Sequence, residues 1–394
     1  MKKDFLAQAE KIKESLKRHA SFLADNPEIG FELQNTKSYV MECLRQIGIE
    51  PVEYGKCGVG GSIKGKGGGR TVLLRADMDA LDISSEDGSV KRMHACGHHF
   101  HTAMLLGCAE ILKKSNDFCG EVRLMFQGAE EILSGAKDMI ESGILDTPRP
   151  EAAMMIHVMT GVDMPVGSVV VSSEGVSAPA ADFFKITVSG KGAHGALSHQ
   201  GIDALSASAY ILISLHEIKA REISIDTRAG LTVGRIVGGK SANALPESVL
   251  LEGSLRAFDE ETRDLLGLRV RQVSENIATA FRASAAVEFT SGCPTLINDE
   301  RISNICALAL KEELGGETVH LSSEFKEKIS GGSEDFAYVT HEIPSVMIAV
   351  CAGSTKDGYK YPLHNACVSF DDRALSVGAA AYCAFAVAFL REKD

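Results

Sequence analysis

The stretch Thr71-Val72-Leu73-Leu74-Arg75-Ala76-Asp77-Met78-Asp79 joins a short apolar run to two carboxylates. The run 71–75 predicts a buried strand, because it is short, apolar and contains branched residues. Two further short apolar runs follow and predict the strands 122–126 and 152–156. The segments between the runs have apolar residues at helical spacing, which predicts the helices 101–114 and 134–142. This alternation predicts an α/β fold, in which helices flank both faces of a mostly parallel sheet.

The pattern changes near residue 181, where strands and helices follow in the order β-α-β-β-α-β. The predicted segments are the strand 183–188, the helix 201–219, the strands 231–238 and 248–256, the helix 260–283 and the strand 286–290. This order is typical of a small ferredoxin-like α+β domain. The first pattern resumes after residue 292, with a helix at 301–313 and a strand at 345–350. We therefore predict a large domain, 1–180 and 293–394, that is interrupted by an inserted domain, 181–292.

Composition counts against several classes of protein. The 394 residues carry a formal net charge of -12 and no long basic block, which argues against nucleic acid and membrane as partners. The ten cysteines are scattered without a CxxC pair, as in proteins of a reducing compartment. Residues 1–24 have the spacing of an amphipathic helix and lack the apolar core of a secretory signal, while 374–390 predicts a buried helix. These features predict a cytoplasmic protein.

The run Met93-His94-Ala95-Cys96-Gly97-His98-His99-Phe100-His101 combines four imidazoles with one thiol. Imidazole and thiolate are the donors that zinc and similar divalent metals prefer. A histidine-rich surface turn is the alternative interpretation. One glycine separates Cys96 from His98, so both side chains can reach the same small volume, and we favour a metal site.

Further donor residues follow the predicted strands of the large domain, and these are Asp77, Asp79, Glu130, Glu131, His157 and His364. A lone histidine at a strand end is usually a satisfied polar group. The carboxyl ends of parallel strands meet at one edge of a sheet, where α/β proteins place their sites, so we expect these side chains to lie close together. Several metal-type donors at one edge predict a metal site.

Glu130 and Glu131 are adjacent, so their side chains cannot perform the same task. If one carboxylate binds a metal, the other can reach a water bound to that metal. The metal lowers the pKa of such a water to about 7, and the second carboxylate can then accept its proton. A solvated acidic turn is the alternative, which the apolar and tight segment 126–129 disfavours.

Together these residues resemble the M20 family of metallopeptidases, and in particular its amidohydrolase subfamily. That subfamily contains hydrolases of N-acyl amino acids, hippurate, aminobenzoyl-glutamate and auxin conjugates. Order and spacing match over essentially the whole chain. Beyond the residues named above, the matching segments are 26–31, 192–196 with His199, 243–246, 253–256, 332–336 and 363–365.

The resemblance implies a centre of two divalent metal ions, zinc or manganese, in each subunit. Its ligands would be Cys96, His98, Glu131, His157 and His364, with Cys96 or water bridging the ions. Glu130 would be the general base and then the general acid to the leaving amine. Asp77 and Asp79 would orient ligands around this centre, Asp79 as a member of the catalytic group.

The resemblance also implies a homodimer formed through residues 181–292, in which His194 reaches the active site of the other subunit and stabilises the oxyanion. Asn243 and Arg256 would bind the carbonyl and the carboxylate of a small substrate, since a planar guanidinium can engage both carboxylate oxygens. A structural salt bridge is the alternative interpretation for Arg256. The implied reaction is hydrolysis of the amide of an N-acyl or N-aroyl amino acid.

The chain departs from the pattern of the family at several positions. His99 stands where an aspartate usually follows Cys-Gly-His, and the additional imidazole predicts an altered metal preference or lower activity. Gly128 replaces a proline, which predicts a looser loop before Glu130. Two other functions stay open, namely a dipeptidase or carboxypeptidase that uses the same site, and a catalytically silent relative that binds a metal or ligand. Glu130 disfavours the silent alternative, because a protein without activity needs no base.

Overall fold

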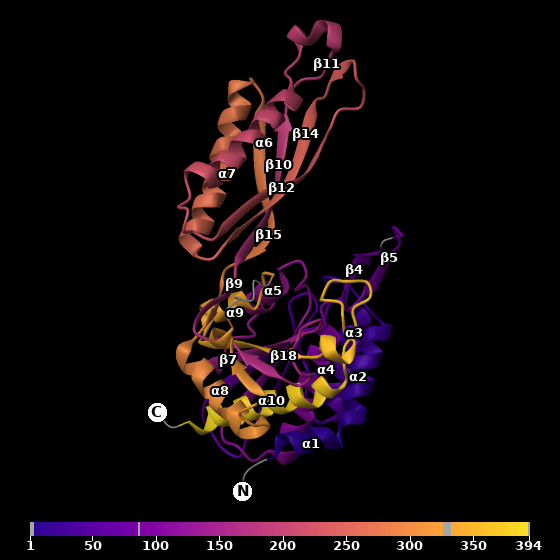
Figure 1. The fold of residues 1–394 in the computed structure, drawn as a ribbon, viewed down its shortest axis with the longest axis vertical. Coiled ribbons are helices and arrows are strands. Elements are labelled where there is room, and N and C mark those ends of the chain that lie inside the picture. Colours follow the sequence, from indigo (N-terminus) through magenta and orange to yellow (C-terminus); the bar gives the residue numbers. More distant parts are fainter. Residues whose placement is uncertain (1–3, 86, 326–331, 393–394) are drawn as a thin grey trace. The chain divides into compact units, whose positions relative to one another are not determined.

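The computed structural model describes residues 4–85, 87–325 and 332–392. By their contacts these residues divide into two compact units (Figure 1). The first unit lies within 1–177, 297–330 and 335–394, and the second lies within 178–296 and 331–334. The chain therefore leaves the first unit after Ser177 and returns to it at Ile297.

An eight-stranded sheet forms the centre of the first unit, in the order β1-β2-β6-β3-β7-β18-β8-β17. Its central strands β6, β3, β7 and β18 run parallel, whereas the pairs β1–β2, β2–β6 and β18–β8 are antiparallel. The strands are β1 (Val52–Tyr54), β2 (Gly58–Lys64), β3 (Thr71–Asp77), β6 (Glu121–Gln127), β7 (Ala152–Met159), β8 (Val169–Val171), β17 (Val319–Leu321) and β18 (Ser345–Cys351).

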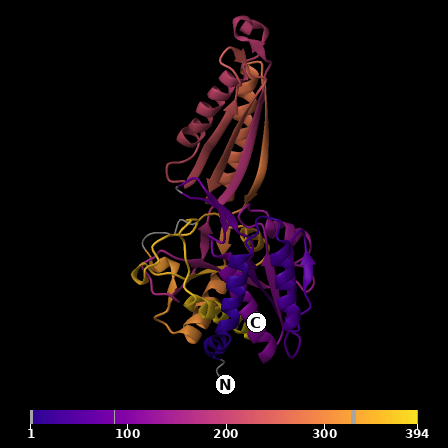
Figure 2. The same ribbon diagram turned by 90° about the vertical axis from the view of Figure 1, so that its right-hand side faces the viewer.

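Helices surround this sheet, most of them in contact with its strands and α1 and α2 packed on other helices (Figures 1 and 2). They are α1 (Phe5–Lys11), α2 (Lys13–Asp25), α3 (Gln34–Gln46), α4 (His98–Ser115), α5 (Gly135–Glu141), α8 (Glu300–Leu314), α9 (Ala337–Glu342) and α10 (Arg373–Arg391). Alternate residues of β3, such as Val72 and Leu74, join the core cluster that α4 and α10 share. Arg75 and Asp77 fall on the opposite face, because side chains alternate along a strand. The predicted α/β class is confirmed.

The helix predicted over 1–24 is divided in the structure, and its first three residues lie outside the described residues. Ile12, with φ -105° and ψ 13°, separates α1 from α2. Helix α1 packs mainly against α10, and α2 packs mainly against α4. The break therefore lets each half bury its apolar face against a different helix.

Helix α10 matches the buried helix predicted over 374–390. By length and composition it could cross a membrane, but 83% of its most apolar window is buried inside the first unit. A membrane-spanning helix needs about 20 apolar residues, and an apolar core helix of similar length passes the same test. The burial identifies α10 as a core helix of this unit.

The second unit is built on an antiparallel four-stranded sheet with the order β12-β14-β10-β15. Along the chain its elements are β10 (Ala180–Ser189), α6 (Ala204–Arg221), β12 (Ala229–Gly238), β14 (Ser248–Ala257), α7 (Glu260–Ala280) and β15 (Ser284–Cys293). Both helices contact each other and the sheet (Figure 2). This is the predicted β-α-β-β-α-β order of a ferredoxin-like unit.

Short elements complete the chain. They are β4 (Leu81–Ser84), β5 (Val90–Met93), β9 (Gly175–Ala178), β11 (Ala193–His194), η1 (Gly195–Gln200), β13 (Ala244–Leu245), β16 (Leu296–Asn298), η2 (Ser322–Glu324) and η3 (Thr355–Asp357). The pair β4–β5 is a hairpin between Asp79 and the histidine-rich run, and the pair β11–β13 joins two loops of the second unit. These strand pairs fix the positions of segments next to or containing proposed site residues, namely Asp79, the histidine-rich run and His194.

Candidate metal centre

The turn at Gly97 determines how the side chains of the histidine-rich run 93–101 are positioned relative to one another. Gly97 has φ 88°, in the left-handed region, and a Cβ atom at this position would lie 2.2 Å from Cγ2 of Val158. Glycine avoids both the strain and the clash, since it has no side chain. Helix α4 begins directly after it, at His98 rather than at residue 101 as predicted. The helix start therefore places His98 close to Cys96, on the other side of a tight turn.

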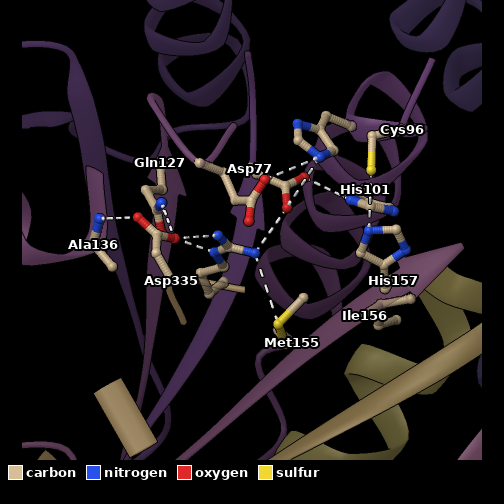
Figure 3. A network of polar contacts seen from close by, with 12 residues as sticks. Asp77, Cys96, His101, Gln127, Ala136, Met155, Ile156, His157 and Asp335 are labelled. Carbon is tan, nitrogen blue, oxygen red and sulfur yellow. Dashed lines mark hydrogen bonds and ion pairs between the residues drawn. The ribbon is translucent and has the colours of Figure 1, made fainter. Parts of the chain in front are cut away.

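The structure brings the five proposed donor residues together. Donor atoms of Cys96, His98 and His157 lie within 4.8 Å of one another, and so do those of Cys96, Glu131 and His364. Cys96 Sγ lies 3.4 Å from His157 Nε2, and His364 Nε2 lies 3.7 Å from Glu131 Oε2. Figure 3 shows the thiol of Cys96 beside the imidazole of His157. Because Cys96 belongs to both groups, one thiolate can be shared by two ions.

His157 and His364 reach this cluster from different elements. His157 lies inside β7 and not after it as predicted, because the strand continues to Met159. Its Nδ1 is hydrogen-bonded to the carbonyl of Val158 at 2.7 Å, which leaves Nε2 for the cluster. His364 has φ 60°, and its N–H donates to the carbonyl of Ala95 at 3.0 Å. This bond ties the His364 loop to the histidine-rich run.

Two donor atoms of the cluster are buried and have no hydrogen-bond partner among the described residues. They are Nε2 of His98 and Oε1 of Glu131, which lie 3.8 Å apart. An unsatisfied buried polar atom costs about 1–3 kcal/mol, so native proteins contain few of them. A divalent cation would satisfy both atoms, and thiolate, imidazole and carboxylate are ligands that zinc accepts. The residues therefore fit a metal ion.

The environment of Cys96 favours the thiolate form of its side chain. Burial raises its pKa, but the charges of His157 and His98 outweigh this effect and hold the pKa well below its usual range. Burial also raises the pKa of Glu131, to about 7, against the attraction of His98. A cation beside Glu131 would favour the charged carboxylate. Cys96 therefore presents the thiolate form that metals bind.

Asp79 positions both glutamates and one histidine. Its carboxylate accepts the N–H groups of Glu130 and Glu131, each at 3.1 Å. Its backbone carbonyl accepts a hydrogen bond from Nδ1 of His98 at 2.8 Å, which leaves Nε2 of that ring for a metal. These contacts are those of a residue that orients ligands, as the resemblance implies for Asp79, while its place in the catalytic group stays a prediction.

Asp77, the last residue of β3, supports the start of α4. It accepts hydrogen bonds from Nδ1 of His101 at 2.6 Å and from Nη1 of Arg75 at 2.8 Å. Burial raises the pKa of Asp77, but His101, His98 and Arg75 together hold it well below its usual range. The other nitrogen of His101, Nε2, accepts the N–H of Val158 at 2.8 Å. Both ring nitrogens of His101 are thus engaged, and this residue supports the site without binding a metal.

A buried charge network that the sequence pattern did not reveal lies behind Asp77 (Figure 3). Asp335 accepts hydrogen bonds from Nη2 of Arg75 at 3.1 Å, from Nε2 of Gln127 at 2.6 Å and from the N–H of Ala136 at 2.9 Å. Arg75 and Asp335 are fully buried. One feature of the sequence could have indicated this network, namely the charged residue Arg75 at the end of an apolar run, because a buried charge needs partners.

We expect Asp335→Ala to lower the free energy of unfolding by about 3–5 kcal/mol, because the variant leaves the charge of Arg75 buried without one of its partners. Urea unfolding followed by circular dichroism measures this loss. Asp117→Ala is the control, since Asp117 forms an exposed ion pair with Lys66 and its removal should change stability little. Equal stability of the two variants would contradict a supporting role for Asp335.

His99 does not join the donor cluster. Its ring lies 5.3 Å from the rings of both His94 and Phe370, measured between centroids. Burial holds the pKa of His99 well below its usual range, so this ring is neutral. No hydrogen bond or ring contact joins His99 to a proposed ligand within the described part of the chain. An effect of His99 on metal preference would therefore have to be indirect.

The loop before Glu130 is tight, so the prediction of a looser loop at Gly128 is wrong. A Cβ atom at Gly128 would lie 2.4 Å from Cδ1 of Leu33 and 2.5 Å from Sγ of Cys57, so a proline would require these side chains to shift. The next residue, Ala129, has φ 57° in the left-handed region. The absence of a side chain at Gly128 lets the loop pack closely against its neighbours and does not make the loop looser.

The proposed substrate residues lie at two ends of the second unit. His194 adjoins Asn243, because the carbonyl of Asn243 accepts the N–H of Gly195 at 2.7 Å. Arg256 pairs with Ala181 at the start of β10, whereas His194 follows the end of this strand. At about 3.3 Å per residue, β10 separates the two ends by about 26 Å. Within one chain, a small substrate therefore cannot contact both Arg256 and His194 or Asn243.

Arg256 forms no ion pair among the described residues, which counts against a structural salt bridge. Its Nη1 donates to the hydroxyl of Ser333, and its guanidinium lies 5.6 Å from the centroid of the Phe183 ring. Neither contact neutralises the positive charge. The guanidinium thus keeps the capacity to bind an anion.

The chain matches the peptidase family M20/M25/M40 over residues 73–388. It is 38% identical over 349 residues to N-acetyl-L-cysteine deacetylase of Bacillus subtilis (strain 168), covering 86% of this chain and 80% of that protein. It is 33% identical over 378 residues to thermostable carboxypeptidase 2 of Saccharolobus solfataricus, covering 93% of each. The crystal structure of the Bacillus subtilis YXEP protein, a dinuclear metal binding peptidase from the M20 family, has a TM-score of 0.75 and 29% identity and covers 97% of this chain and 99% of that one. The chain therefore belongs to the peptidase family M20/M25/M40 and is a metal-dependent hydrolase that acts on amide bonds.

Proposed function

We propose that this hydrolase cleaves the amide of N-acyl or N-aroyl amino acids at a centre of two divalent metal ions. The ligands would be Cys96, His98, Glu131, His157 and His364. The observation that carries the proposal is that Cys96 belongs to two donor groups at once. When bound, such ions polarise an amide carbonyl and lower the pKa of water to about 7. The relation to N-acetyl-L-cysteine deacetylase supports the class of substrate.

Glu130 would carry out the proton transfers. Its Oε2 lies 3.8 Å from Nε2 of His98, and Glu130 belongs to neither of the two groups that share Cys96. The residue is buried, with 6% of its surface exposed, so little bulk water competes for its carboxylate. In this position the carboxylate accepts a proton from the attacking water. It then transfers that proton to the leaving nitrogen as the C–N bond breaks.

We further propose that the enzyme is a homodimer formed through the second unit. The edge strand β12 carries Ile236 and Val237, which are 47% and 48% exposed. Helix α6 carries Tyr210 and Ile213, which are 55% and 61% exposed. An unpaired strand edge with apolar side chains favours association with another chain. A second copy would also resolve the separation of Arg256 from His194.

In such a dimer, residues of both subunits would contact one substrate. His194 and Asn243 would donate hydrogen bonds to the carbonyl oxygen, where negative charge develops during the attack. Arg256 would engage both oxygens of the substrate carboxylate. These assignments require Arg256 from one subunit and the pair His194 and Asn243 from the other.

The thiolate favours zinc, and manganese is the alternative. We expect Cys96→Ser to retain much less of both ions than the wild type, because Cys96 belongs to both donor groups. Mass spectrometry of the metal content of the purified protein measures this loss. Cys367→Ser is the matched control, since Cys367 is exposed and belongs to neither group. A wild-type metal content in Cys96→Ser would show that the thiol is not a shared ligand.

A panel of substrates separates this proposal from its alternatives. We expect the holoenzyme to hydrolyse acetyl, benzoyl or longer-chain conjugates of amino acids with a higher kcat/KM than dipeptides that carry a free amino group. The opposite order would favour the dipeptidase or carboxypeptidase alternative, which the relation to thermostable carboxypeptidase 2 supports. Full metal content without turnover of any member of the panel would favour a silent relative.

We also infer that the protein acts in the cytoplasm. None of its ten cysteines forms a disulfide bond in the described part of the chain, and eight of them are buried. Proteins of oxidising compartments usually pair their cysteines, whereas a reducing compartment would preserve the thiolate of Cys96.

A further inference from the structure

A cavity of about 330 Å³ lies between α2, α3 and α4 of the first unit. Its lining includes Arg18, His19 and Tyr39 together with Ile47 and Leu106, and it contains none of the proposed metal ligands. This volume is at the lower end of the range for small-molecule sites. Along α4, Leu106 is about 12 Å from His98 at 1.5 Å per residue, so the cavity is separate from the metal centre.

The charged groups at this cavity differ in their partners. Glu42 lies 4.0 Å from Arg45, and Glu110 pairs with Lys114. Arg18 forms no ion pair or hydrogen bond among the described residues, although its side chain lines the same cavity. Arg18 is thus the charged group of the lining that has no ion pair among the described residues. Two carboxylates also line the cavity, so it is this guanidinium, and not the overall charge of the lining, that an anionic group of a ligand could engage.

Polar and apolar surfaces are both present in the cavity. Nδ1 of His19 and the hydroxyl of Tyr39 are 2.8 Å apart and form a hydrogen bond. Burial lowers the pKa of His19, so the ring is neutral and has one N–H to donate. Leu106 and Ile47 supply apolar surface, as does Cys43, whose thiol stays protonated because burial raises its pKa to about 11.

We propose that this cavity is a second ligand site, which binds a small monocarboxylate with an apolar tail. The carboxylate would pair with Arg18 and accept a hydrogen bond from the His19–Tyr39 pair, while the tail would cover Leu106 and Ile47. A guanidinium suits this ligand because its planar fork can donate to both oxygens. The proposal does not depend on the proposed function, since it uses no residue of the metal centre.

A single tryptophan can report binding at this cavity. The chain contains no tryptophan, and the ring of Phe22 stacks on Tyr39 with 3.8 Å between centroids. We expect hexanoate to cause a saturable change in the emission of the holoenzyme variant Phe22→Trp. Hexanol and hexylamine keep the tail but lack the carboxylate, so they should bind at least about tenfold more weakly, as expected for loss of a charge-assisted contact.

Two further variants in the Phe22→Trp background test whether Arg18 is the residue that binds the carboxylate of the ligand. Arg18→Gln should weaken hexanoate binding at least about tenfold, whereas Arg149→Gln should leave it unchanged, because Arg149 is exposed, pairs with Glu342 and lies outside the cavity lining. Amide hydrolysis should persist in both variants, which shows that the fold and the metal centre are intact. Isothermal titration of the unmodified holoenzyme with hexanoate, compared with Arg18→Gln, gives an independent measurement. Equal affinities of the two proteins, or equal binding of hexanol and hexanoate, would overturn the proposal.

Discussion

Replacement of Glu130 by glutamine is expected to lower kcat for hydrolysis of an N-acyl amino acid by at least about 100-fold, the scale usual for loss of a general base. The amide of glutamine has nearly the shape of the carboxylate but cannot accept the proton of the attacking water. Metal content should stay at the wild-type level, since Glu130 lies outside the two groups that share Cys96. Steady-state kinetics together with metal analysis of the same preparation measures both quantities.

Glu131→Gln provides a contrast at the neighbouring position. Glu131 belongs to the group with Cys96 and His364, and its Oε1 is buried without a hydrogen-bond partner among the described residues. We therefore expect this variant to lose metal as well as activity. Near-normal turnover of Glu130→Gln, or an unchanged metal content in Glu131→Gln, would mean that the roles of the two glutamates are wrongly assigned.

His194→Ala is expected to lower kcat by about 100-fold to 1000-fold, the usual effect of removing one donor to an oxyanion. His194 is exposed and lies in the second unit, where its Nδ1 accepts the N–H of Ala196 at 3.2 Å. Its removal should therefore leave stability and metal content unchanged. A thermal unfolding curve and metal analysis of the variant check these two controls.

Co-expression of Glu130→Gln and His194→Ala subunits with different tags tests whether the site is shared. In a random mixture half of the dimers are mixed, and each mixed dimer has one intact site, so about a quarter of wild-type activity should return. Each variant expressed alone stays inactive and is the control. Mixed dimers without activity would mean that His194 serves the site of its own chain.

Several parts of this molecule could be predicted from local pattern. The strands β3, β6 and β7 were predicted because short apolar runs recur between helical segments. The central residues of each predicted strand lie within the observed strand. Element ends were less predictable. Helix α4 starts at His98 because Gly97 adopts a left-handed turn, and β7 extends past His157 because its neighbour β18 pairs with it up to Met159. Such ends depend on contacts with distant segments.

The sequence by itself determined the type of fold and indicated the candidate donor residues. Apolar periodicity reports which side chains a segment buries, and thiol, imidazole and carboxylate groups keep their metal affinity in any fold. Only the tertiary structure decided that Asp335 supports Arg75 and that Arg256 and Asn243 lie at opposite ends of one sheet. These relations join residues that are distant along the chain, so they depend on strand order and pairing, which local pattern does not encode.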